Sequence, residues 1–403
     1  MGLGFVGLTT ALSFSNKKFK VTGFDINPKL ISLLNNGKIP FNEPLLNKNL
    51  KKSISSKRIS FTNSIKFSEN KNYAIFICVG TPVNKESDYD LKSLIKTLEM
   101  IQKEVKNKCH VYIKSTVLPG TTEYLRKKII KNKDVKIASN PEFLREGKAW
   151  EDFNKADKIV IGFDDEEFIN ISKKLYYGFK GKLIFVNSST AEFIKQISNA
   201  MLSSMISFSN NFALLAEKFD NIDIKSAFRA IQLDKRFFGY PSQISSYIYP
   251  GLGFGGYCLP KDIEAIHNFS KKFKQDKFFE NVIKVNKDIF DLHLKKILSK
   301  VKKKQMICIL GMSFKEGTDD IRDSRSIKLV NELLKRKYSN LILCDKLANQ
   351  ELKKIYKTEN VKIISKPYYN KNIIYVLGNT DNLYLSFLKK IPSFQIIDTR
   401  YLI

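Results

Sequence analysis

Short apolar runs alternate with longer lysine-rich stretches of helical pattern from the start of the chain to about residue 190. Runs rich in β-branched residues and separated by helices are typical of a parallel sheet with crossover helices. The expected strands span residues 20–24, 73–79, 111–114, 135–138, 158–162 and 184–185. The alternation returns at residues 306–310, 341–344, 361–364, 373–377 and 395–397. The pattern therefore predicts two α/β regions.

The stretch between these regions has a different period. From Ala191 to Lys218 apolar residues recur at helical spacing without an internal Pro or Gly, which predicts one long helix or a closely broken pair that joins two domains. Helical pattern continues to about residue 300, interrupted by a Pro- and Gly-rich loop at 247–260. Because 403 residues are too many for one ordinary domain, we expect three, at 1–190, 191–300 and 301–403.

The net charge of +29 does not by itself indicate nucleic-acid binding. Only nine of the 69 basic residues are arginine, and the lysines are spread along the whole chain rather than gathered in one stripe. A general lysine bias explains this composition, although a positive field favours anionic small ligands. We expect no nucleic-acid partner.

Cysteine and histidine usage argues against metal sites and disulfides. Five cysteines without a CxxC pair favour reduced thiols in the cytoplasm, and the three histidines do not have metal-ligand spacing. We therefore expect no metal. No signal sequence is expected, and the longest apolar runs, at 307–310 and 373–377, are far shorter than a membrane span. We expect no membrane partner either.

Residues 2–7 read Gly-Leu-Gly-Phe-Val-Gly and precede a helical stretch, a strand and then Asp25. Glycines at these positions permit a tight turn and the close approach of a pyrophosphate to a helix N-terminus. An acid about 20 residues later accepts hydrogen bonds from the adenosine ribose and disfavours a 2′-phosphate. These features predict a doubly wound, Rossmann-like domain that binds NAD.

One part of this motif is missing from the sequence. The glycines should follow a buried strand, yet only Met1 precedes Gly2. Loss of a central strand would expose apolar helix faces and leave backbone groups without partners. The expectation is a start site placed too late, or a truncated chain, with several apolar residues upstream in the native protein.

Residues 250–262 read Pro-Gly-Leu-Gly-Phe-Gly-Gly-Tyr-Cys-Leu-Pro-Lys-Asp, which places Cys258 at the end of a glycine-rich loop beside Lys261 and Asp262. Backbone donors and neighbouring cations favour the thiolate, which is the nucleophilic form of cysteine. The other four cysteines lie in or beside apolar strand candidates, where a structural role is more common. Cys258 is therefore the expected nucleophile.

Together these motifs resemble the UDP-glucose/GDP-mannose dehydrogenases, NAD-dependent enzymes that oxidise a primary alcohol of a sugar nucleotide to a carboxylate. The resemblance covers almost the full length. It implies two Rossmann-like, doubly wound α/β domains joined by the long helix and a helical middle domain, with the sugar nucleotide bound by the C-terminal one. It rests on residues 2–7, 79–82, 114–117, 139–147, 195 with 199, 250–262, 311–324 and 398–400.

Oxidation of an alcohol to an acid removes two hydrides, so the aldehyde must be held between the two steps. A cysteine can trap it as a thiohemiacetal, which is oxidised to a thioester that water hydrolyses. Lys195 and Asn199 lie one helical turn apart, which suits oxyanion stabilisation. The resemblance implies that role, assistance by Asp262 in deprotonating the alcohol, and Glu142 as base for the hydrolytic water. The expected catalytic residues are Cys258, Glu142, Lys195, Asn199, Asp262 and Thr116.

The resemblance also implies the ligand contacts. Expected NAD contacts are Gly2, Gly4, Phe5, Val6, Gly7, Asp25, Lys29, Val79, Gly80, Thr81, Pro82, Ser115, Thr116, Glu146 and Arg322. Expected substrate contacts are Glu142, Phe143, Leu144, Arg145, Lys195, Asn199, Arg236, Tyr249, Gly251, Phe254, Gly255, Phe314, Lys315 and Arg400. The long helix would form the core of a homodimer in which Arg236 comes from the partner subunit. In this chain residues 234–239 replace a shorter Arg-Ile-Gly of the family.

Several activities fit these residues. UDP-glucose oxidation to UDP-glucuronate is the expected one, because the Gly-Tyr-Cys-Leu-Pro-Lys-Asp sequence looks closer to enzymes acting on UDP-glucose than to those acting on N-acetylated sugars. GDP-mannose or a UDP-N-acetylhexosamine is the alternative substrate. A two-electron dehydrogenase would need no cysteine loop, because it traps no aldehyde. A non-catalytic protein would bind NAD or sugar nucleotide without forming NADH.

Overall fold

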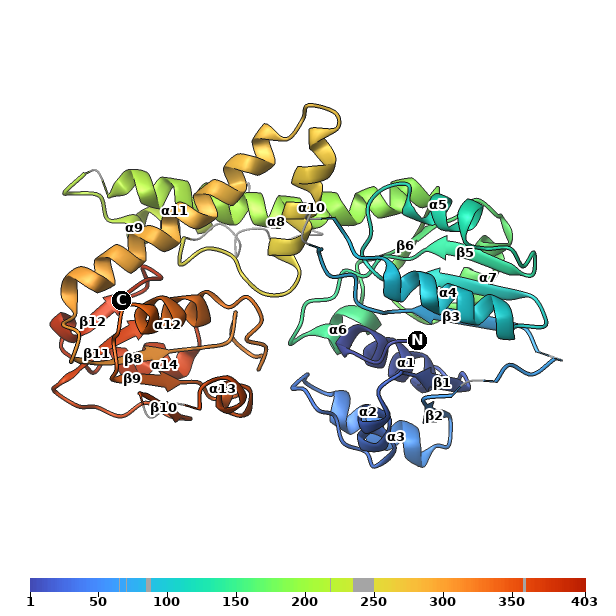
Figure 1. Cartoon of the computed structure of the whole chain (residues 1–403), viewed down its shortest axis with the longest axis horizontal. Helices are drawn as coiled ribbons and strands as arrows, with labels where there is room; N and C mark the ends of the chain where they lie inside the picture. Colours follow the sequence, from blue (N-terminus) through green and yellow to red (C-terminus); the bar gives the residue numbers. More distant parts are fainter. Residues whose placement is uncertain (65, 70, 85–87, 218, 235–249, 358–359) are drawn as a thin grey trace. The chain divides into compact units, whose positions relative to one another are not determined.

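The computed structural model describes residues 1–64, 66–69, 71–84, 88–217, 219–234, 250–357 and 360–403. The chain divides into two compact units, Met1–Ser198 and Asn199–Ile403, and each is described by itself. The predicted order of an α/β region, a helical region and a second α/β region is confirmed (Figure 1).

The main sheet of the first unit has five strands in the order β3-β4-β5-β6-β7. Helices α4 (Lys92–Glu104), α5 (Thr121–Lys128), α6 (Ala149–Asn154) and α7 (Glu167–Leu175) connect them. The strands are β3 (Tyr73–Ile77), β4 (Cys109–Ile113), β5 (Val135–Ser139), β6 (Lys158–Gly162) and β7 (Lys182–Val186). All of them were predicted from the sequence, with bounds that differ by a few residues.

Two neighbouring strands, β6 and β7, run in an unexpected direction. The sequence predicted a parallel sheet, but β6 pairs with β5 in antiparallel fashion through Ser139 and Gly162. The connection between them, residues 140–157, contains the short helix α6 and the loop that carries Glu142. β6 therefore runs opposite to β5, and β7 is parallel to β6.

A separate two-stranded parallel sheet joins β1 (Val21–Phe24) to β2 (Ile59–Thr62). β2 was not predicted from the sequence, and its four residues are flanked by polar and basic side chains. Helices α1 (Phe5–Asn16), α2 (Pro28–Asn35) and α3 (Leu46–Ser55) pack on this sheet, and buried leucines such as Leu12, Leu34 and Leu50 form the core between them.

A cavity of about 650 Å³ lies between the two sheets of this unit, lined by Val21 of β1, Phe76 of β3 and Phe14 of α1 among others. Met1 lies at its border and takes part in strand-like bonds on the β3 side. The Met1 ammonium donates to the Phe76 carbonyl (2.7 Å), and the Cys78 amide donates to the Met1 carbonyl (2.7 Å). On the β1 side, the Gly2 amide donates to the Phe24 carbonyl (2.9 Å). Met1 and Gly2 thus connect the two sheets at one end of the cavity.

The predicted long helix is one unbroken helix, α8 (Ser188–Ala216), rather than a broken pair (Figure 1). The division between the two units falls within it, after Ser198. After α8, the described residues up to 300 form α9 (Ile224–Gln232), α10 (Leu259–Lys271) and α11 (Lys277–Lys300). No helix in the described part of the chain is long and apolar enough to cross a membrane.

The second unit ends in a five-stranded, wholly parallel sheet of order β10-β9-β8-β11-β12. Its central strands are continuously apolar and buried on both faces, as parallel sheets require. Its elements are β8 (Met306–Leu310), α12 (Arg325–Lys335), β9 (Leu341–Cys344), α13 (Asn349–Ile355), β10 (Val361–Ile364), β11 (Ile373–Leu377), α14 (Asn382–Leu388), η3 (Ser393–Gln395) and β12 (Ile396–Asp398). Ligands of open α/β sheets bind beyond the carboxyl ends of the strands, which directs attention to the loops there.

Candidate active site

The glycine turn closes onto the end of β1. Gly2 has a φ of +80°, and the Leu3 amide donates to Asp25 Oδ2 (2.8 Å). A Cβ on Gly7 would lie 1.8 Å from the Gly2 carbonyl oxygen, so this position requires glycine. These contacts fix the turn to the strand end, as the motif predicts.

The N-terminus of α1 is open to a ligand. Gly4 is its N-cap and brings no side-chain cap, and the first turn holds no acidic residue. Apart from Gly4 itself and its two chain neighbours, no heavy atom of the described residues lies within 4 Å of a Cβ built on Gly4. The free amides and positive dipole end of such a terminus fit a pyrophosphate, so the residues present fit NAD. Phe5 and Val6 lie in the first turn of α1, and Lys29 lies exposed in the first turn of α2.

Two predicted cofactor segments are joined by hydrogen bonds. The Thr81 hydroxyl donates to the Thr116 carbonyl (2.7 Å), and the Ser115 hydroxyl donates to the Val79 carbonyl (2.7 Å). These residues follow β3 and β4, and Gly80 and Pro82 are exposed beside them. The structure therefore brings residues 79–82 and 115–116 to one edge of the sheet.

Glu142 and Lys195 form a buried pair. Glu142 Oε2 accepts from the Leu144 amide (2.6 Å), and Glu142 Oε1 lies 3.4 Å from Lys195 Nζ. The Lys195 ammonium also lies 5.3 Å from the centroid of the Phe143 ring. A carboxylate fixed by an amide and an ammonium is oriented to accept a proton from water.

The segment before Glu142 is anchored at Asn140. Its amide donates to the Ile113 carbonyl (2.8 Å), its Nδ2 donates to the Val160 carbonyl (2.9 Å), and Tyr176 donates to its Oδ1 (2.7 Å). Lys114 Nζ lies 3.4 Å from both Asn140 oxygens. Burial lowers the pKa of Lys114, and the attraction of Cys78 and Glu142 opposes that effect. The chain leaving β5 is thereby held rigidly in front of Glu142.

The residues after Glu142 have local partners as well. Leu144 packs against the core cluster that holds Tyr112 and Phe153. The Arg145 guanidinium is bidentate to Asp152, through Nε (3.0 Å) and Nη2 (2.7 Å). Glu146 is half-buried in the same loop.

Cys258 in the second unit is the N-cap residue of α10, and its carbonyl accepts from the Asp262 amide (3.0 Å). The positive end of a helix dipole stabilises a thiolate. Cys258 is half-buried, whereas Cys109, Cys308 and Cys344 are buried. Burial raises the pKa of Cys109 and of Cys344 to about 12, which keeps them as thiols.

Polar side chains surround the first turn of α10. The buried carboxylate of Asp262 accepts from Asn199 Nδ2 and from Lys261 Nζ. Burial lowers the pKa of Lys261, but the attraction of Asp262 and Cys258 outweighs it, so the net pKa is raised. A charged ammonium therefore accompanies the thiol.

The glycine loop before Cys258 packs too tightly for side chains. Gly253 has a φ of +98°, and a Cβ there would lie 2.3 Å from Asn286 Oδ1, which accepts from the Phe254 amide (2.8 Å). A Cβ on Gly255 would lie 2.4 Å from the Asp323 carbonyl oxygen. The Gly251 amide donates to Asn210 Oδ1 (2.8 Å).

The structure brings predicted ligand contacts from the C-terminal sheet to this loop. Phe314 lies against Gly256, and the Arg400 guanidinium lies against Gly251. Arg322 bonds to Asp320 and lies 4.4 Å from the centroid of the Tyr257 ring. Lys315 follows Phe314, with its ammonium 5.5 Å from that ring. Two other predicted contacts, Arg236 and Tyr249, lie outside the described residues.

Sequence reasoning missed several buried polar residues that shape the site. Glu43 accepts from the Gly147 and Ala149 amides (2.7 and 2.8 Å) and so fixes the end of the loop that follows Glu142. Gln196 donates to the Val117 carbonyl (3.1 Å). Glu192 lies one helical turn before Lys195 on α8, and this spacing alone does not indicate that it caps another helix. Among the described residues, no three His, Cys, Asp or Glu side chains are grouped to hold a metal ion.

Three family models match the chain in succession. Residues 1–180 match the NAD-binding domain of the UDP-glucose/GDP-mannose dehydrogenase family, residues 189–288 its central domain, and residues 308–402 its UDP-binding domain. The first match confirms the predicted cofactor, NAD.

Individual relatives agree with the family models. The chain is 34% identical over 372 residues to the UDP-glucose 6-dehydrogenase of Rickettsia bellii, covering 90% of this chain and 83% of that one. A UDP-glucose dehydrogenase structure from Pyrobaculum islandicum has a TM-score of 0.90 at 30% identity, covering 100% of this chain and 93% of that one. A UDP-D-ManNAc dehydrogenase structure from Pyrococcus horikoshii has a TM-score of 0.80 at 25% identity, covering 100% and 94%. The chain belongs to the UDP-glucose/GDP-mannose dehydrogenase family and is an NAD-dependent sugar-nucleotide dehydrogenase.

Proposed function

We propose that this enzyme oxidises UDP-glucose to UDP-glucuronate in a four-electron reaction with a covalent intermediate on Cys258. The main support for a four-electron reaction is the position of Cys258 at the start of α10, beside the ammonium of Lys261. A dehydrogenase that stops at the aldehyde has no use for a nucleophile there. The similarity to the UDP-glucose 6-dehydrogenase of Rickettsia bellii supports the choice of substrate.

The first half of the reaction makes and traps the aldehyde. When bound, NAD supplies the hydride acceptor for each of the two oxidations. Asp262, through a water or Lys195, assists removal of the proton from the C6 hydroxyl as hydride leaves C6. The Cys258 sulfur then adds to the aldehyde carbon, and Lys195 and Asn199 stabilise the oxyanion of the thiohemiacetal.

The second half releases the acid. Loss of a second hydride from the thiohemiacetal gives a thioester on Cys258. Glu142 takes a proton from a water, whose oxygen adds to the thioester carbon, and the C–S bond breaks to give the carboxylate and a free thiolate. The fixed orientation of Glu142 by the Leu144 amide and Lys195 supports this role.

The ligand contacts follow the two units. NAD would be held by the glycine turn and Asp25, with residues 79–82 and 115–116 beside it, and by Glu146. The sugar nucleotide would be held by the Cys258 loop together with Phe314, Lys315 and Arg400, where two cations suit a diphosphate.

The test is the number of NADH formed per sugar nucleotide consumed, measured by absorbance with UDP-glucose, GDP-mannose and UDP-N-acetylhexosamines in parallel. Two NADH with UDP-glucose are expected. Two NADH with another sugar would keep the chemistry and change the substrate, and the similarity to the Pyrococcus horikoshii UDP-D-ManNAc dehydrogenase makes that the alternative to include. One NADH would indicate a two-electron dehydrogenase, and binding without NADH a non-catalytic protein.

We also propose a cytoplasmic homodimer. Five large apolar side chains on α8 are each 46–58% exposed and recur at helical spacing: Phe193, Ile197, Met201, Phe208 and Phe212. An exposed apolar stripe of this kind marks a protein interface. The family resemblance implies that the partner subunit then supplies Arg236 to the substrate site. None of the five cysteines forms a disulfide, which supports a reducing compartment.

A further inference from the structure

We propose that Glu192 is a positioning residue, whose buried carboxylate joins α8 to the start of α5 and thereby keeps Lys195 on Glu142. The proposal rests on the proposed function, in which Lys195 and Glu142 act on the substrate. It concerns only residues of the first unit.

The Glu192 side chain is 1% exposed and fully engaged with the start of α5. Oε2 accepts from the Gly120 amide (2.7 Å), and Oε1 accepts from the Thr122 amide (2.7 Å) and hydroxyl (2.6 Å). Gly120 is the N-cap of α5 and has no side chain to cap the helix. Glu192 therefore supplies from α8 the cap that the sequence of α5 lacks.

A second side chain of α8 holds the loop that leads into α5. Gln196 Nε2 donates to the Val117 carbonyl (3.1 Å) and lies 3.3 Å from the Tyr89 hydroxyl. The neighbouring Thr116 carbonyl is held in turn by Thr81. The loop from β4 to α5, which carries the expected cofactor contacts Ser115 and Thr116, is thus fixed by α8 at Val117 and again at Gly120.

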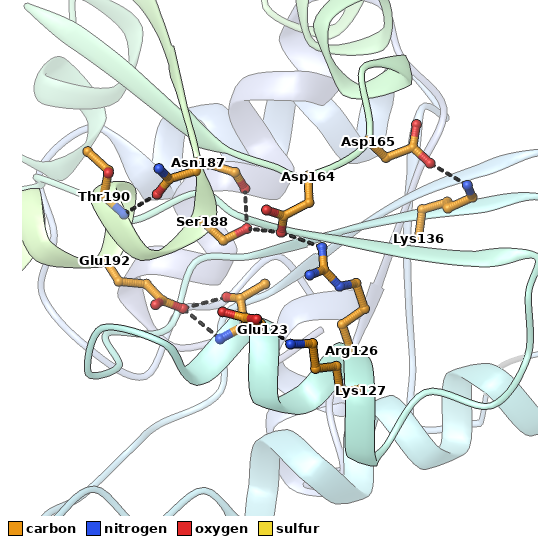
Figure 2. A network of polar contacts seen from close by, with 12 residues as sticks. Glu123, Arg126, Lys127, Lys136, Asp164, Asp165, Asn187, Ser188, Thr190 and Glu192 are labelled. Carbon is orange, nitrogen blue, oxygen red and sulfur yellow. Dashed lines mark hydrogen bonds and ion pairs between the residues drawn. The ribbon is translucent and has the colours of Figure 1, made fainter.

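The first turn of α8 is fixed to α5 by another route (Figure 2). The Ser188 hydroxyl donates to Asp164 Oδ2 (3.0 Å), and Arg126 of α5 pairs with the same oxygen (2.5 Å). Asn187 Oδ1 accepts from the Thr190 amide (2.8 Å) and caps α8. Contacts at both Ser188 and Glu192 restrain rotation and sliding of this part of α8.

Lys195 follows Glu192 by three residues and lies on the same side of the helix. Its contact with Glu142 is long, at 3.4 Å, so a small rotation of α8 would break it. Loss of the Glu192 bonds would also leave the Gly120 amide without a partner in the interior. The carboxylate thus links the geometry of the reacting groups to the cap of α5, without contacting substrate itself.

The test compares Glu192→Gln with Glu123→Gln. The first keeps the volume but replaces one acceptor oxygen by an amide group that cannot accept. The second removes an exposed carboxylate of α5 that pairs with Lys127 (2.5 Å), and it is the matched control (Figure 2). For Glu192→Gln we expect kcat to fall about 10- to 100-fold while KM for NAD and for sugar nucleotide changes less than about threefold, because misplacement of reacting groups affects the chemical step. Glu123→Gln should have wild-type values.

Amide hydrogen exchange of residues 117–122 and 192–196 gives a readout that does not require activity. Glu192→Gln should exchange at least about tenfold faster there than Glu123→Gln. Wild-type kcat in folded Glu192→Gln, or unchanged exchange, would overturn the proposal, as would equal rises in both KM values at constant kcat. If the wild-type enzyme forms no NADH with any sugar nucleotide, the proposed function fails by itself, and the exchange data still decide whether Glu192 holds α8 to α5.

Discussion

Cys258 begins a helix beside a charged ammonium, whereas Cys109, Cys308 and Cys344 are enclosed in sheets. We expect Cys258→Ser to lower NADH formation by at least about 1,000-fold. A serine hydroxyl stays protonated at neutral pH and is too weak a nucleophile to trap the aldehyde. Binding of sugar nucleotide, measured by calorimetry, should stay within about threefold of wild type. Cys344→Ala is the matched control and should retain activity per folded molecule. Full turnover by Cys258→Ser would remove the thiol from the mechanism.

Glu142 offers a test of the hydrolytic step alone. In Glu142→Gln the amide can still accept from the Leu144 amide but cannot take a proton from water. The variant should therefore form NADH rapidly in the first turnover and then stall as an acyl-enzyme, visible as added mass on the intact protein. Glu151→Gln on α6, which removes an exposed partner of Lys155, should behave as wild type. A wild-type steady-state rate without added mass would contradict the assignment of the base.

At the residue scale, the sequence predicts the functional side chains that lie together in a short motif. Cys258, Lys261 and Asp262 are adjacent in the chain, so their grouping needed no knowledge of the fold. Glu43 and Glu192 could not be found in this way, because their backbone partners lie 104 and 72 residues away in the sequence. A buried acid that caps a distant helix has no signature of its own in the sequence.

At the element scale, apolar runs predict where strands lie but not how they pair. All strands of the two five-stranded sheets were predicted, because each contains a short run of apolar residues bounded by polar ones. β2 was not predicted, because four residues are too few for their periodicity to distinguish a strand from a loop. The direction of β6 relative to β5 is a property of the tertiary structure, which the hydrophobic pattern does not report.

The cavity between β1 and β3 leads to a prediction about stability. An engineered extension of five alternating Val and Ile residues fused before Met1 should pair with both strands, fill apolar space and raise the melting temperature. It would also move the α-amino group out of the interior, where burial lowers its pKa. The expected rise is a few degrees, on the order of 2–8 °C for 1–2 kcal/mol.

A Gly-Ser extension of the same length is the control for this experiment. It adds backbone donors and acceptors without apolar side chains, so it separates filling of the cavity from simple lengthening of the chain. Equal melting temperatures for the two extended proteins would show that the cavity does not accept a strand.

At the scale of the whole molecule, the net charge and the exposed apolar surface have opposite effects on dimer formation. A net charge of +29 favours binding of anionic ligands such as NAD and sugar nucleotides, but it also makes two copies of the chain repel. The apolar stripe on α8 favours association. Because salt screens repulsion between exposed charges and leaves apolar burial intact, the proposed homodimer should become tighter as ionic strength rises.

Met201 lies in the middle of that stripe, so a substitution there tests whether the stripe is the dimer interface. Met201→Glu would place a charge in a dehydrated contact, and we expect a monomer by light scattering at micromolar concentration where the wild type is a dimer. Tyr177→Glu, at a side chain that is 84% exposed beyond α7, is the control and should remain dimeric.

If the partner subunit also supplies Arg236, the monomer should lose activity chiefly through a raised KM for sugar nucleotide, and specific activity of the wild type should fall on dilution. A wild-type protein that is monomeric and fully active at all concentrations and salt levels would refute both the interface and the shared site.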